Sequence, residues 1–463
     1  MTACIRAEMA HLIDAAITAV RPETLVPRRI ESRGGELLLD HAPFPEAVRL
    51  DGRIVVIGGG KAAAGMAAAV EAVLAPAIGA GADVRGIVSV PEGCGRRLER
   101  VEVRETRPAG VNLPTPAAVA ATAEMLGAVA ALGPDDLAIV IVTGGGSALL
   151  ENPRAGVSLD DLINVTRFLS ASGAEIRELN LVRQALSRVK TGGLAHACNA
   201  GRLVALVLSD VIGDPLDLIS SGPCMPAAAD PSAALAILRR HAAADVAPEV
   251  TRHLERAAAE GLPPASHATD GEWMTPAGCR VSHVLLGSND TAVDAAARMA
   301  RDLGYDVTIR HAVPASEAAE SVGRRLAAEA AELRVAAARD GRSHAVVEGG
   351  EAVVSVPRDH GVGGRNQQTV LAAVESWQQG GSVWPAGLAI ASIGTDGEDG
   401  PTDAAGGIVD DEVAQQLAGA GTDVARAVAR CDAYAALAAA DGLIRTGPTG
   451  TNVADVRIIL ARP

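Results

Sequence analysis

Short glycine-rich stretches are followed by a lysine, a serine or an arginine at three places in the sequence. Residues 58–60 precede Lys61, residues 144–146 precede Ser147, and residues 361–364 precede Arg365. Glycine lets an anion come close to backbone N–H groups, and a cationic side chain at the same place adds attraction. Such stretches are typical of sites for phosphate or carboxylate groups, and an arginine delivered by glycines suits phosphoryl transfer.

The first stretch, Gly58, Gly59 and Gly60, follows a predicted strand and opens a predicted helix, where the helix dipole favours an anion. It also matches the dinucleotide-binding pattern G-x-G-x-x-A, completed by Ala63. That pattern calls for an acidic residue about 20 residues further on, and Glu92 lies too far along the chain. An anion-binding loop is the favoured interpretation, with a tight turn carrying an exposed lysine as the alternative.

The second stretch contains Gly144, Gly145, Gly146 and Ser147 and again follows a predicted strand. Carboxyl ends of parallel strands meet at one edge of a sheet, so both stretches are expected to line the same crevice. A flexible turn without a ligand is the alternative interpretation of this second stretch.

Two aspartates follow the predicted strand at residues 203–208. Asp210 comes directly after the strand and Asp214 four residues later. An enzyme that uses a magnesium nucleotide offers one or two carboxylates to the metal, so both are predicted metal ligands, with Asp210 the better placed. Asp210 is also a candidate to orient the reacting hydroxyl. The alternative is that these aspartates cap a helix or a turn.

Arg365 begins a predicted helix after the third glycine-rich stretch, where its planar fork suits carboxylate and phosphoryl oxygens. An exposed surface arginine is the alternative. The segment at residues 394–403 is rich in glycine and acids, and Asp396 within it is predicted to contact Mg²⁺ or a substrate hydroxyl unless the segment is a solvated turn. Lys190 and Asn289 are the remaining predicted loop contacts to nucleotide or substrate.

Other catalytic patterns are absent from the sequence. A Walker loop needs a glycine where Val55 stands and a hydroxyl where Ala62 stands. No H-E-x-x-H zinc pattern occurs, and Ser147 lacks the frame of a G-x-S-x-G nucleophile. The ten histidines are dispersed singly. We therefore expect neither a P-loop enzyme, a metalloprotease nor a serine hydrolase.

The elements that must position these residues alternate between strands and helices. After an N-terminal helix at residues 5–20, apolar runs predict strands at residues 54–57, 85–90, 137–142 and 203–208. Helical patterns fall at residues 116–132, 159–170 and 175–189, and an alanine-rich helix follows Lys61. Continuous apolar strands that alternate with helices predict a parallel sheet covered on both faces.

The alternation restarts after residues 263–277, whose composition of Pro, Ser, Thr, Gly and Asp is typical of a linker or surface loop. Strands are predicted at residues 281–286, 306–309, 345–348 and 352–356, with helices at residues 291–303 and 315–340. At 463 residues two domains are the default expectation. We place them at residues 1–262 and 278–463.

The overall composition excludes several classes of protein. The chain has only seven aromatic residues and a net charge of −15, so it lacks both the basic stripe and the stacking surfaces of a nucleic-acid-binding protein. Six scattered cysteines form no C-x-x-C pair, which favours a reducing compartment. No apolar run approaches the roughly 20 residues of a membrane span. We expect a cytoplasmic protein without nucleic-acid or membrane partners.

Taken together, these segments resemble the class II glycerate kinase family, whose C-terminal half is called the MOFRL domain. The most specific are Leu-Ser-Asp-Val-Ile-Gly-Asp ending at Asp214, Gly-Gly-Arg-Asn-Gln around Arg365, Gly-Thr-Asp-Gly ending at Gly397, and Thr-Gly-Thr-Asn-Val ending at Val453. The resemblance covers nearly the whole chain. It implies an α/β fold with a Rossmann-like N-terminal domain, a smaller α/β MOFRL domain, and an active site in the cleft between them.

The resemblance further implies ATP, a divalent metal taken as Mg²⁺, and phosphorylation of the C2 hydroxyl of D-glycerate. Lys61 and Arg365 match the family's basic residues at the reacting phosphate. The expected function is therefore glycerate 2-kinase, with domain closure bringing the two cations together. The alternatives are an NAD(P)H-dependent hydroxypyruvate reductase, a name also given to family members, and a protein that only binds an organic acid. A homodimer is left open.

Overall fold

A computed structural model describes residues 4–40, 46–226, 229–243, 246–260, 272–315 and 317–463. The chain forms two compact units. The N-terminal unit comprises Leu25–Leu208 and Pro215–Leu286, and the C-terminal unit comprises Met1–Thr24, Ser209–Asp214 and Gly287–Pro463. Each unit is described by itself below.

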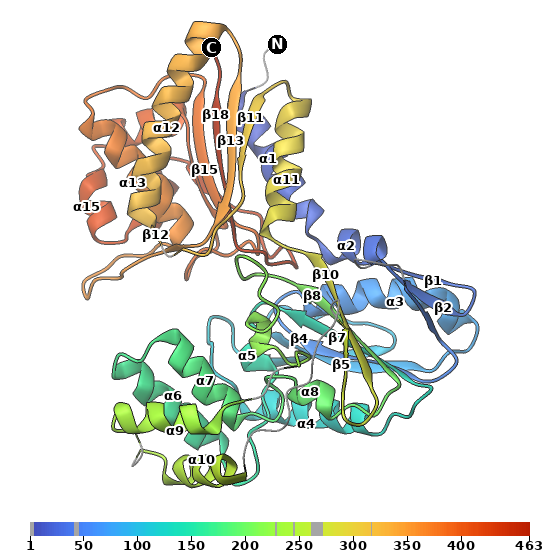
Figure 1. Ribbon diagram of the computed structural model, residues 1–463. Helices are drawn as coiled ribbons and strands as arrows, with labels where there is room; N and C mark the ends of the chain where they lie inside the picture. Colours follow the sequence, from blue (N-terminus) through green and yellow to red (C-terminus); the bar gives the residue numbers. More distant parts are fainter. Residues whose placement is uncertain (1–3, 41–45, 227–228, 244–245, 261–271, 316) are drawn as a thin grey trace. The chain divides into compact units, whose positions relative to one another are not determined.

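A seven-stranded sheet forms the centre of the N-terminal unit (Figure 1). Its strands, in sheet order, are β6 (Val101–Arg107), β5 (Val84–Pro91), β4 (Ile54–Gly59), β7 (Leu137–Thr143), β8 (Arg202–Leu208), β10 (Arg280–Gly287) and β9 (Glu272–Met274). From β6 to β8 all neighbours are parallel. The carboxyl ends of these five strands therefore lie along one edge of the sheet.

The two middle strands explain why this sheet is buried on both faces. Every residue of β4 and of β7 is buried, and the apolar side chains of both strands are Val, Ile, Leu or Ala. Helix α3 (Ala63–Gly79) packs on one face and helix α4 (Pro116–Ala130) on the other (Figure 1). Thr115 caps α4 by accepting a hydrogen bond from the N–H of Ala118. Pro116 is the first residue of the helix, where an N–H group would have no partner within the helix, so proline fits there.

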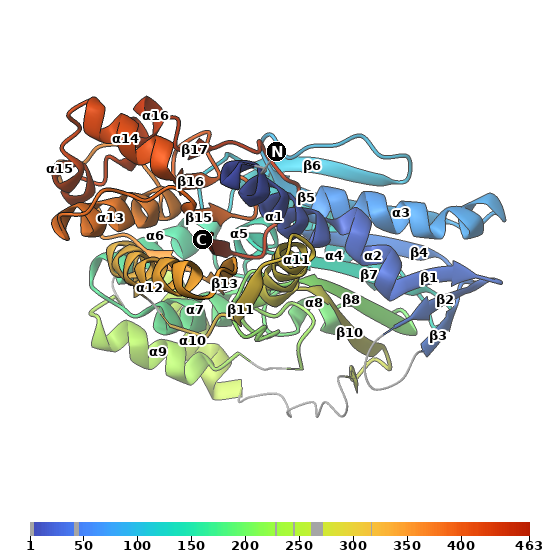
Figure 2. The ribbon, with the colours of Figure 1, turned by 90° about the horizontal axis from the view of Figure 1, so that it is seen from above.

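Two smaller assemblies complete the N-terminal unit. An antiparallel sheet of β1 (Ile30–Arg33), β2 (Glu36–Leu39) and β3 (Glu46–Arg49) lies beside α3, as Figures 1 and 2 show. Four helices with an apolar core of their own form the other: α6 (Leu159–Ala171), α7 (Ile176–Leu186), α9 (Pro231–Arg240) and α10 (Pro248–Glu260). The short elements are α2 (Pro22–Arg29), α5 (Gly146–Leu149), α8 (Gly193–His196) and the 3₁₀ turn η1 (Ile219–Ser221).

The C-terminal unit is built on a six-stranded mixed sheet. Its strands, in sheet order, are β11 (Asp306–Arg310), β13 (His344–Gly350), β18 (Asp455–Ala461), β15 (Leu388–Gly394), β16 (Gly406–Val409) and β17 (Leu443–Ile444). Strands β11 and β13 are parallel, whereas β18 is antiparallel to both of its neighbours. A separate parallel pair joins β12 (Glu317–Ala318) to β14 (Ala352–Val353).

Helices cover both faces of this second sheet (Figure 1). On one face lie α12 (Ala319–Asp340) and α13 (Arg365–Gln379); on the other lie α1 (Ile5–Ala19) and α11 (Asn289–Asp302). The remaining helices are α14 (Asp411–Gly419), α15 (Val424–Ala429) and α16 (Ala433–Ala439). Because α1 packs on α11, β15 and β18, the first helix of the chain belongs to the C-terminal unit.

The predicted two-domain α/β architecture is confirmed, but several details differ from the expectations. Strands β15, β16 and β18 were not predicted, and the strand predicted at residues 352–356 is the shorter β14. The strand predicted at residues 281–286 exists as β10, yet it completes the sheet of the N-terminal unit. Strand β6 was not predicted, because its alternating charges hide it. The boundaries of the two units also differ from those of the predicted domains, 1–262 and 278–463. Met1–Thr24 and Ser209–Asp214 belong to the C-terminal unit.

The predicted linker at residues 263–277 lies partly outside the described residues, which omit 261–271. Among the helices that the structure describes, none is both long and apolar enough to cross a membrane.

Candidate active site

The first glycine stretch forms a tight turn between β4 and α3. Gly58 and Gly60 have φ angles of 149° and 141°, which other residues rarely adopt. A Cβ atom on Gly60 would lie 2.2 Å from Oγ1 of Thr143, so only glycine fits there. The predicted first stretch is therefore packed directly against the end of β7.

Hydrogen bonds join this turn to the second glycine stretch. The N–H of Lys61 donates to the carbonyl of Gly144 over 2.9 Å, and the N–H of Ala62 donates to Oγ1 of Thr143 over 3.2 Å. The N–H of Gly60 donates to Ser89 O. The structure thus brings the two predicted loops together at the carboxyl edge of the sheet.

The same hydrogen bonds correct one expectation. Backbone N–H groups of Gly58, Gly59 and Gly60 were predicted to hold an anion, but those of Gly60, Lys61 and Ala62 already donate within the protein. The N–H groups of Gly58 and Gly59 lie within β4, between its paired neighbours β5 and β7. What the first loop offers a ligand is therefore the half-buried side chain of Lys61.

Two serines that were not selected from the sequence support the second loop. Gly145 has φ = 78° and precedes the short helix α5, and Ser147 Oγ lies 2.7 Å from Ser221 Oγ. Ser220 Oγ donates to Thr143 O over 2.8 Å. Ser220 and Ser221 both have positive φ angles, 51° and 63°, a strained backbone that the surrounding packing must hold in place. The only signal in the sequence was the Ser-Ser-Gly-Pro segment that follows Asp214.

Lys190 supports the second loop from inside the protein. Its side chain and that of Glu151 are both completely buried, and their charged groups are 2.7 Å apart. Lys190 Nζ also donates to the carbonyls of Ser147, over 2.9 Å, and Leu150, over 3.4 Å. Burial lowers the pKa of Lys190, and the charge of Glu151 opposes this effect. In this arrangement the predicted loop contact Lys190 holds the backbone around Ser147 and has no exposed surface.

The C-terminal unit carries the other predicted cation, Arg365, at the first turn of α13. Its guanidinium pairs with Asp455, with Nε to Oδ2 at 2.8 Å, and with Glu351, with Nη1 to Oε1 at 2.8 Å. Burial disfavours the charged form, but the charge and hydrogen bonds of Asp455 and the charge of Glu351 raise the pKa of Arg365 above its ordinary value. Arg365 is therefore a fixed and permanently charged group.

A buried carboxylate holds the start of the same helix. Asp399 accepts hydrogen bonds from the N–H groups of Asn366, at 3.0 Å, and Gln367, at 2.8 Å. Burial raises the pKa of Asp399 to about 6 in spite of these hydrogen bonds. The predicted residue of this segment, Asp396, instead accepts from the N–H of Glu398 at 3.1 Å, which closes a turn.

Asn289, Asp210 and Asp214 lie around the start of β18 or in the segment Ser209–Asp214 of the same unit. Nδ2 of Asn289 donates to the carbonyls of Val453 and Asp455, so this predicted contact holds the backbone that carries the partner of Arg365. Asp210 accepts from Asn452 Nδ2 over 3.5 Å. Asp214 has φ = 52° and donates its N–H to Val211 O, as in a turn.

No cluster of three or more His, Cys, Asp or Glu side chains in the described ranges is arranged to hold a metal ion. The prediction that Asp210 and Asp214 bind a metal therefore stays a prediction.

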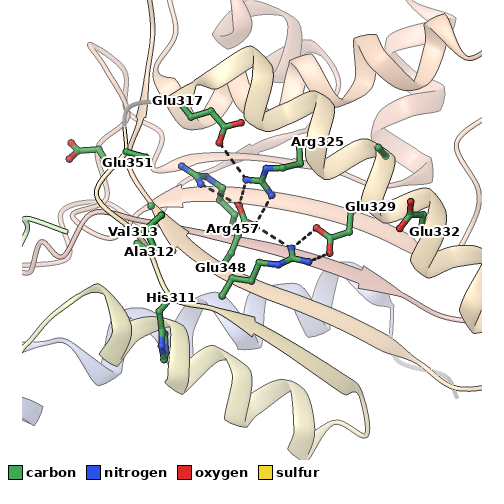
Figure 3. A pocket seen from close by; sticks show the side chains of 15 residues that line it. His311, Ala312, Val313, Glu317, Arg325, Glu329, Glu332, Glu348, Glu351 and Arg457 are labelled. Atoms are coloured by element: carbon green, nitrogen blue, oxygen red, sulfur yellow. Dashed lines mark hydrogen bonds and ion pairs between the residues drawn. The ribbon is translucent and has the colours of Figure 1, made fainter. Parts of the chain in front are cut away.

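A cavity of about 570 Å³ in the C-terminal unit is bordered by Glu351, the partner of Arg365 (Figure 3). At its centre lies the buried Glu348, which pairs with Arg325 at 2.8 Å and Arg457 at 3.3 Å. Burial alone would raise the pKa of Glu348, but Arg325 and Arg457 outweigh it and lower the pKa. Nothing in the sequence pattern pointed to this cluster, because its members come from three separate elements.

The predicted site residues thus divide between the units. In the N-terminal unit lie Gly58, Gly59, Gly60, Lys61, Gly145, Gly146, Ser147 and Lys190, and in the C-terminal unit Asp210, Asp214, Asn289, Arg365 and Asp396. The structure brings the members of the first group together around two loops. Those of the second group lie near the start of α13, the start of β18 and the segment Ser209–Asp214.

Comparison with known proteins matches two families to this chain. Residues 8–255 match a family described as a domain of unknown function, DUF4147, and residues 344–455 match the MOFRL family. A D-glycerate 2-kinase of Thermotoga maritima is 35% identical over 88% of this chain and 90% of its own length. A protein of Agrobacterium vitis named as a putative hydroxypyruvate reductase is 36% identical over 88% of this chain and 99% of its own length. The crystal structure of a glycerate kinase from Thermotoga maritima superposes with a TM-score of 0.80 at 32% identity, covering 99% of both chains.

Proposed function

This chain belongs to the glycerate kinase family with a C-terminal MOFRL domain, and from that premise we propose that it is a glycerate 2-kinase. In this reaction the C2 hydroxyl of D-glycerate attacks the γ-phosphate of ATP, the bond from that phosphorus to ADP breaks, and the products are 2-phosphoglycerate, ADP and the proton of the hydroxyl. The observation that carries the proposal is likeness over 88% of the chain to a protein named D-glycerate 2-kinase, combined with the joined loops that present Lys61.

The chemistry asks the protein mainly for positioning and positive charge. A transferred phosphoryl group carries its charge on three oxygens, and cations that are fixed before the reaction stabilise that charge without reorganising. The side chain of Arg365 is fixed by Asp455 and Glu351, and the backbone of Lys61 is held by the hydrogen bond from its N–H to Gly144 O. We assign both side chains to the γ-phosphoryl group. Ser147 and the backbone of the second loop are assigned to an anionic group of ATP or glycerate.

A divalent metal is part of the proposal, with Mg²⁺ as the expected ion. It would neutralise charge on the phosphate oxygens of ATP. Mg²⁺ is commonly held by one or two carboxylates together with substrate phosphates and water, so a half-buried single carboxylate such as Asp210 fits this role. Asp214 is assigned as its support. A cytoplasmic location stays a prediction.

A hydroxypyruvate reductase is the second candidate, because one similar protein carries that name and the first loop matches G-x-G-x-x-A. In a dinucleotide site the pyrophosphate binds the free N–H groups at the start of the helix after the loop. Here the N–H groups of Lys61 and Ala62 donate to Gly144 O and Thr143 Oγ1. The geometry therefore favours the kinase.

A coupled assay tests the proposal. Purified protein is mixed with D-glycerate, ATP and Mg²⁺, and enolase converts 2-phosphoglycerate to phosphoenolpyruvate without a mutase. We expect activity in the wild type, a loss of at least about 100-fold in Lys61→Ala and in Arg365→Lys, and little change in Arg430→Ala. Arg430 is a matched control because it pairs with the exposed Asp359 in the same unit as Arg365. Oxidation of NADH with hydroxypyruvate, and no product from glycerate, would instead establish the reductase.

A further inference from the structure

Strand β6 ends in a buried arginine at the carboxyl edge of the parallel sheet. Only 3% of Arg107 is exposed, although β6 is the outermost strand of this sheet. Because β6, β5, β4 and β7 run parallel, Arg107 ends its strand on the same edge at which Gly59 and Thr143 end theirs. This is the edge at which ligands bind in open α/β sheets.

The side chain of Arg107 lies against the second glycine loop. A Cβ atom placed on Gly145 would be 3.8 Å from Nη2 of Arg107 and 3.7 Å from Cγ of Lys61. The guanidinium and the stem of the lysine therefore flank the same residue. Nη1 of Arg107 donates to Oδ1 of Asn112 over 2.7 Å, which fixes the orientation of the planar group.

We propose that Arg107 and Lys61 together bind one oxyanion, a phosphoryl or carboxylate group of a substrate, beside Gly145. The inference rests on the proposed function for its substrates. Gly145 has φ = 78° and no side chain, so no side chain of its own stands between the guanidinium of Arg107 and the stem of Lys61. The N–H groups of Gly60, Lys61 and Ala62 donate within the protein, so at the first loop it is the charge of the Lys61 side chain that would attract an anion.

The two cations would contact the anion in different ways. A guanidinium offers two parallel N–H groups, which match two oxygens of a phosphoryl or carboxylate group, whereas an ammonium acts as a compact charge. The hydrogen bond that Arg107 donates to Asn112 Oδ1 holds the fork of Arg107 in one plane, so little side-chain freedom is lost on binding. Arg107 is thus assigned as a binding residue that orients the anion.

The test compares Arg107→Gln and Arg107→Lys with Arg104→Gln. Arg104 lies on the same strand and pairs with Glu102 and Glu124, so its replacement removes a charge without touching the loops. The probe is inorganic phosphate. Its binding is followed by the slowed acetylation of Lys61, measured by mass spectrometry of the peptide that contains this residue, so that the lysine added in Arg107→Lys is read separately; Lys190, the other lysine of the chain, is completely buried. KM for ATP and for D-glycerate are then measured separately.

We expect Arg107→Gln to weaken phosphate protection of Lys61 at least tenfold. Protection in Arg107→Lys should lie between that of Arg107→Gln and that of the wild type, and protection in Arg104→Gln should stay within twofold of the wild type. A rise of KM for ATP alone would assign the anion to phosphate, and a rise for glycerate alone to the carboxylate. If Arg107→Gln does not fold, phosphate protection in Arg107→Lys is compared with that in the wild type instead.

Equal protection in the wild type and the folded Arg107 variants would overturn the proposal, as would a wild type that phosphate does not protect. Phosphate protection is independent of turnover. If protection depends on Arg107 but the wild type makes no 2-phosphoglycerate, the proposed function fails and the anion site stands.

Discussion

Asp399 is a carboxylate whose protonation should change with pH in the folded protein. Its pKa is raised to about 6 by burial, from an ordinary value of 3.8. The native state therefore holds this proton more tightly than the unfolded chain does. The stabilisation is fully present below about pH 4 and is lost as the pH rises through about 6. The full difference is about 3 kcal/mol, at 1.36 kcal/mol for each pKa unit.

Asp399→Asn tests this titration, since the amide resembles the protonated acid and does not ionise. We expect the free energy of unfolding of the variant, relative to the wild type, to rise by up to about 3 kcal/mol between pH 4 and pH 7. Urea unfolding of both proteins across this range measures the difference. A difference that does not vary with pH would show that Asp399 has an ordinary pKa. Asp396→Asn is the control, because its carboxylate closes a turn in the same segment.

Single residues were predictable from the sequence where they follow glycine at the end of an element. Lys61 and Arg365 were chosen in this way, and each does begin or precede a helix. Asp399 stood in the indicated acidic segment, yet Asp396 was chosen, because only the fold shows which of the two reaches the start of α13. The sequence around Arg107 did not indicate a binding residue, because its guanidinium lies beside Gly145, which is 38 positions away in the chain.

At the scale of elements, the turn between β4 and α3 should tolerate no side chain at Gly60. Gly60→Ala would place a Cβ atom 2.2 Å from Thr143 Oγ1 at a φ of 141°. We expect a loss of roughly 3 kcal/mol in the free energy of unfolding, together with loss of kinase activity, because the two loops must separate. Thermal and urea unfolding and the coupled assay measure both effects.

Gly127→Ala is the matched control for this substitution. Gly127 lies inside α4 with no atom within 4 Å of the added Cβ. Alanine is the better helix former, so stability should rise by up to about 1 kcal/mol with activity unchanged. A Gly60→Ala protein as stable and active as the Gly127→Ala protein would contradict the described packing.

Strands that are continuous apolar runs could be predicted from the sequence. Strands whose position depends on pairing with a distant part of the chain could not. Strands β4, β7 and β8 are continuous apolar runs, and each lies within a residue or two of its predicted position. Strand β6 carries Glu102, Arg104 and Glu105, so its pattern resembles a polar loop. Strand β10 was found, but its place in the sheet depends on its position beside β8, which ends about 70 residues earlier in the chain, and no local pattern reveals that neighbour.

On the scale of the whole molecule, the N-terminal helix should stabilise the C-terminal unit. Arg6 in α1 donates from Nε to the buried Asp410 over 2.8 Å and pairs with Asp441 over 3.0 Å. Asp410 also caps α14 through the N–H of Val413. Arg6→Ala leaves that carboxylate with one partner fewer, and we expect the C-terminal unit to lose about 2 kcal/mol.

Hydrogen exchange separates the units in this test. Amides of β18 should exchange faster in Arg6→Ala, whereas those of β7 in the N-terminal unit should not change. Arg342→Ala is the control, because its pair with Asp306 is exposed on both sides and should contribute less than about 1 kcal/mol. Equal acceleration in β7 and β18 would show that α1 does not stabilise the C-terminal unit specifically.

The domain count followed from chain length, but the boundaries did not. Sequence patterns are read along the chain, and they placed residues 1–262 in one domain. The structure groups α1 with α11, β15 and β18, which follow it by more than 250 residues. The segment Ser209–Asp214, which contains Asp210, joins the C-terminal unit for the same reason, since contacts rather than sequence order define a unit.

The distance along the chain between α1 and β18 sets an order of folding during translation. Strand β18 lies between β13 and β15, so the second sheet cannot close before it leaves the ribosome. At roughly 5–20 residues per second it emerges roughly 20–90 seconds after α1. The strands of the first sheet lie within residues 54–287 and can pair earlier. Until β18 emerges, the apolar face of α1, with Met9, Leu12 and Ile17, lacks part of the sheet that it covers in the folded unit.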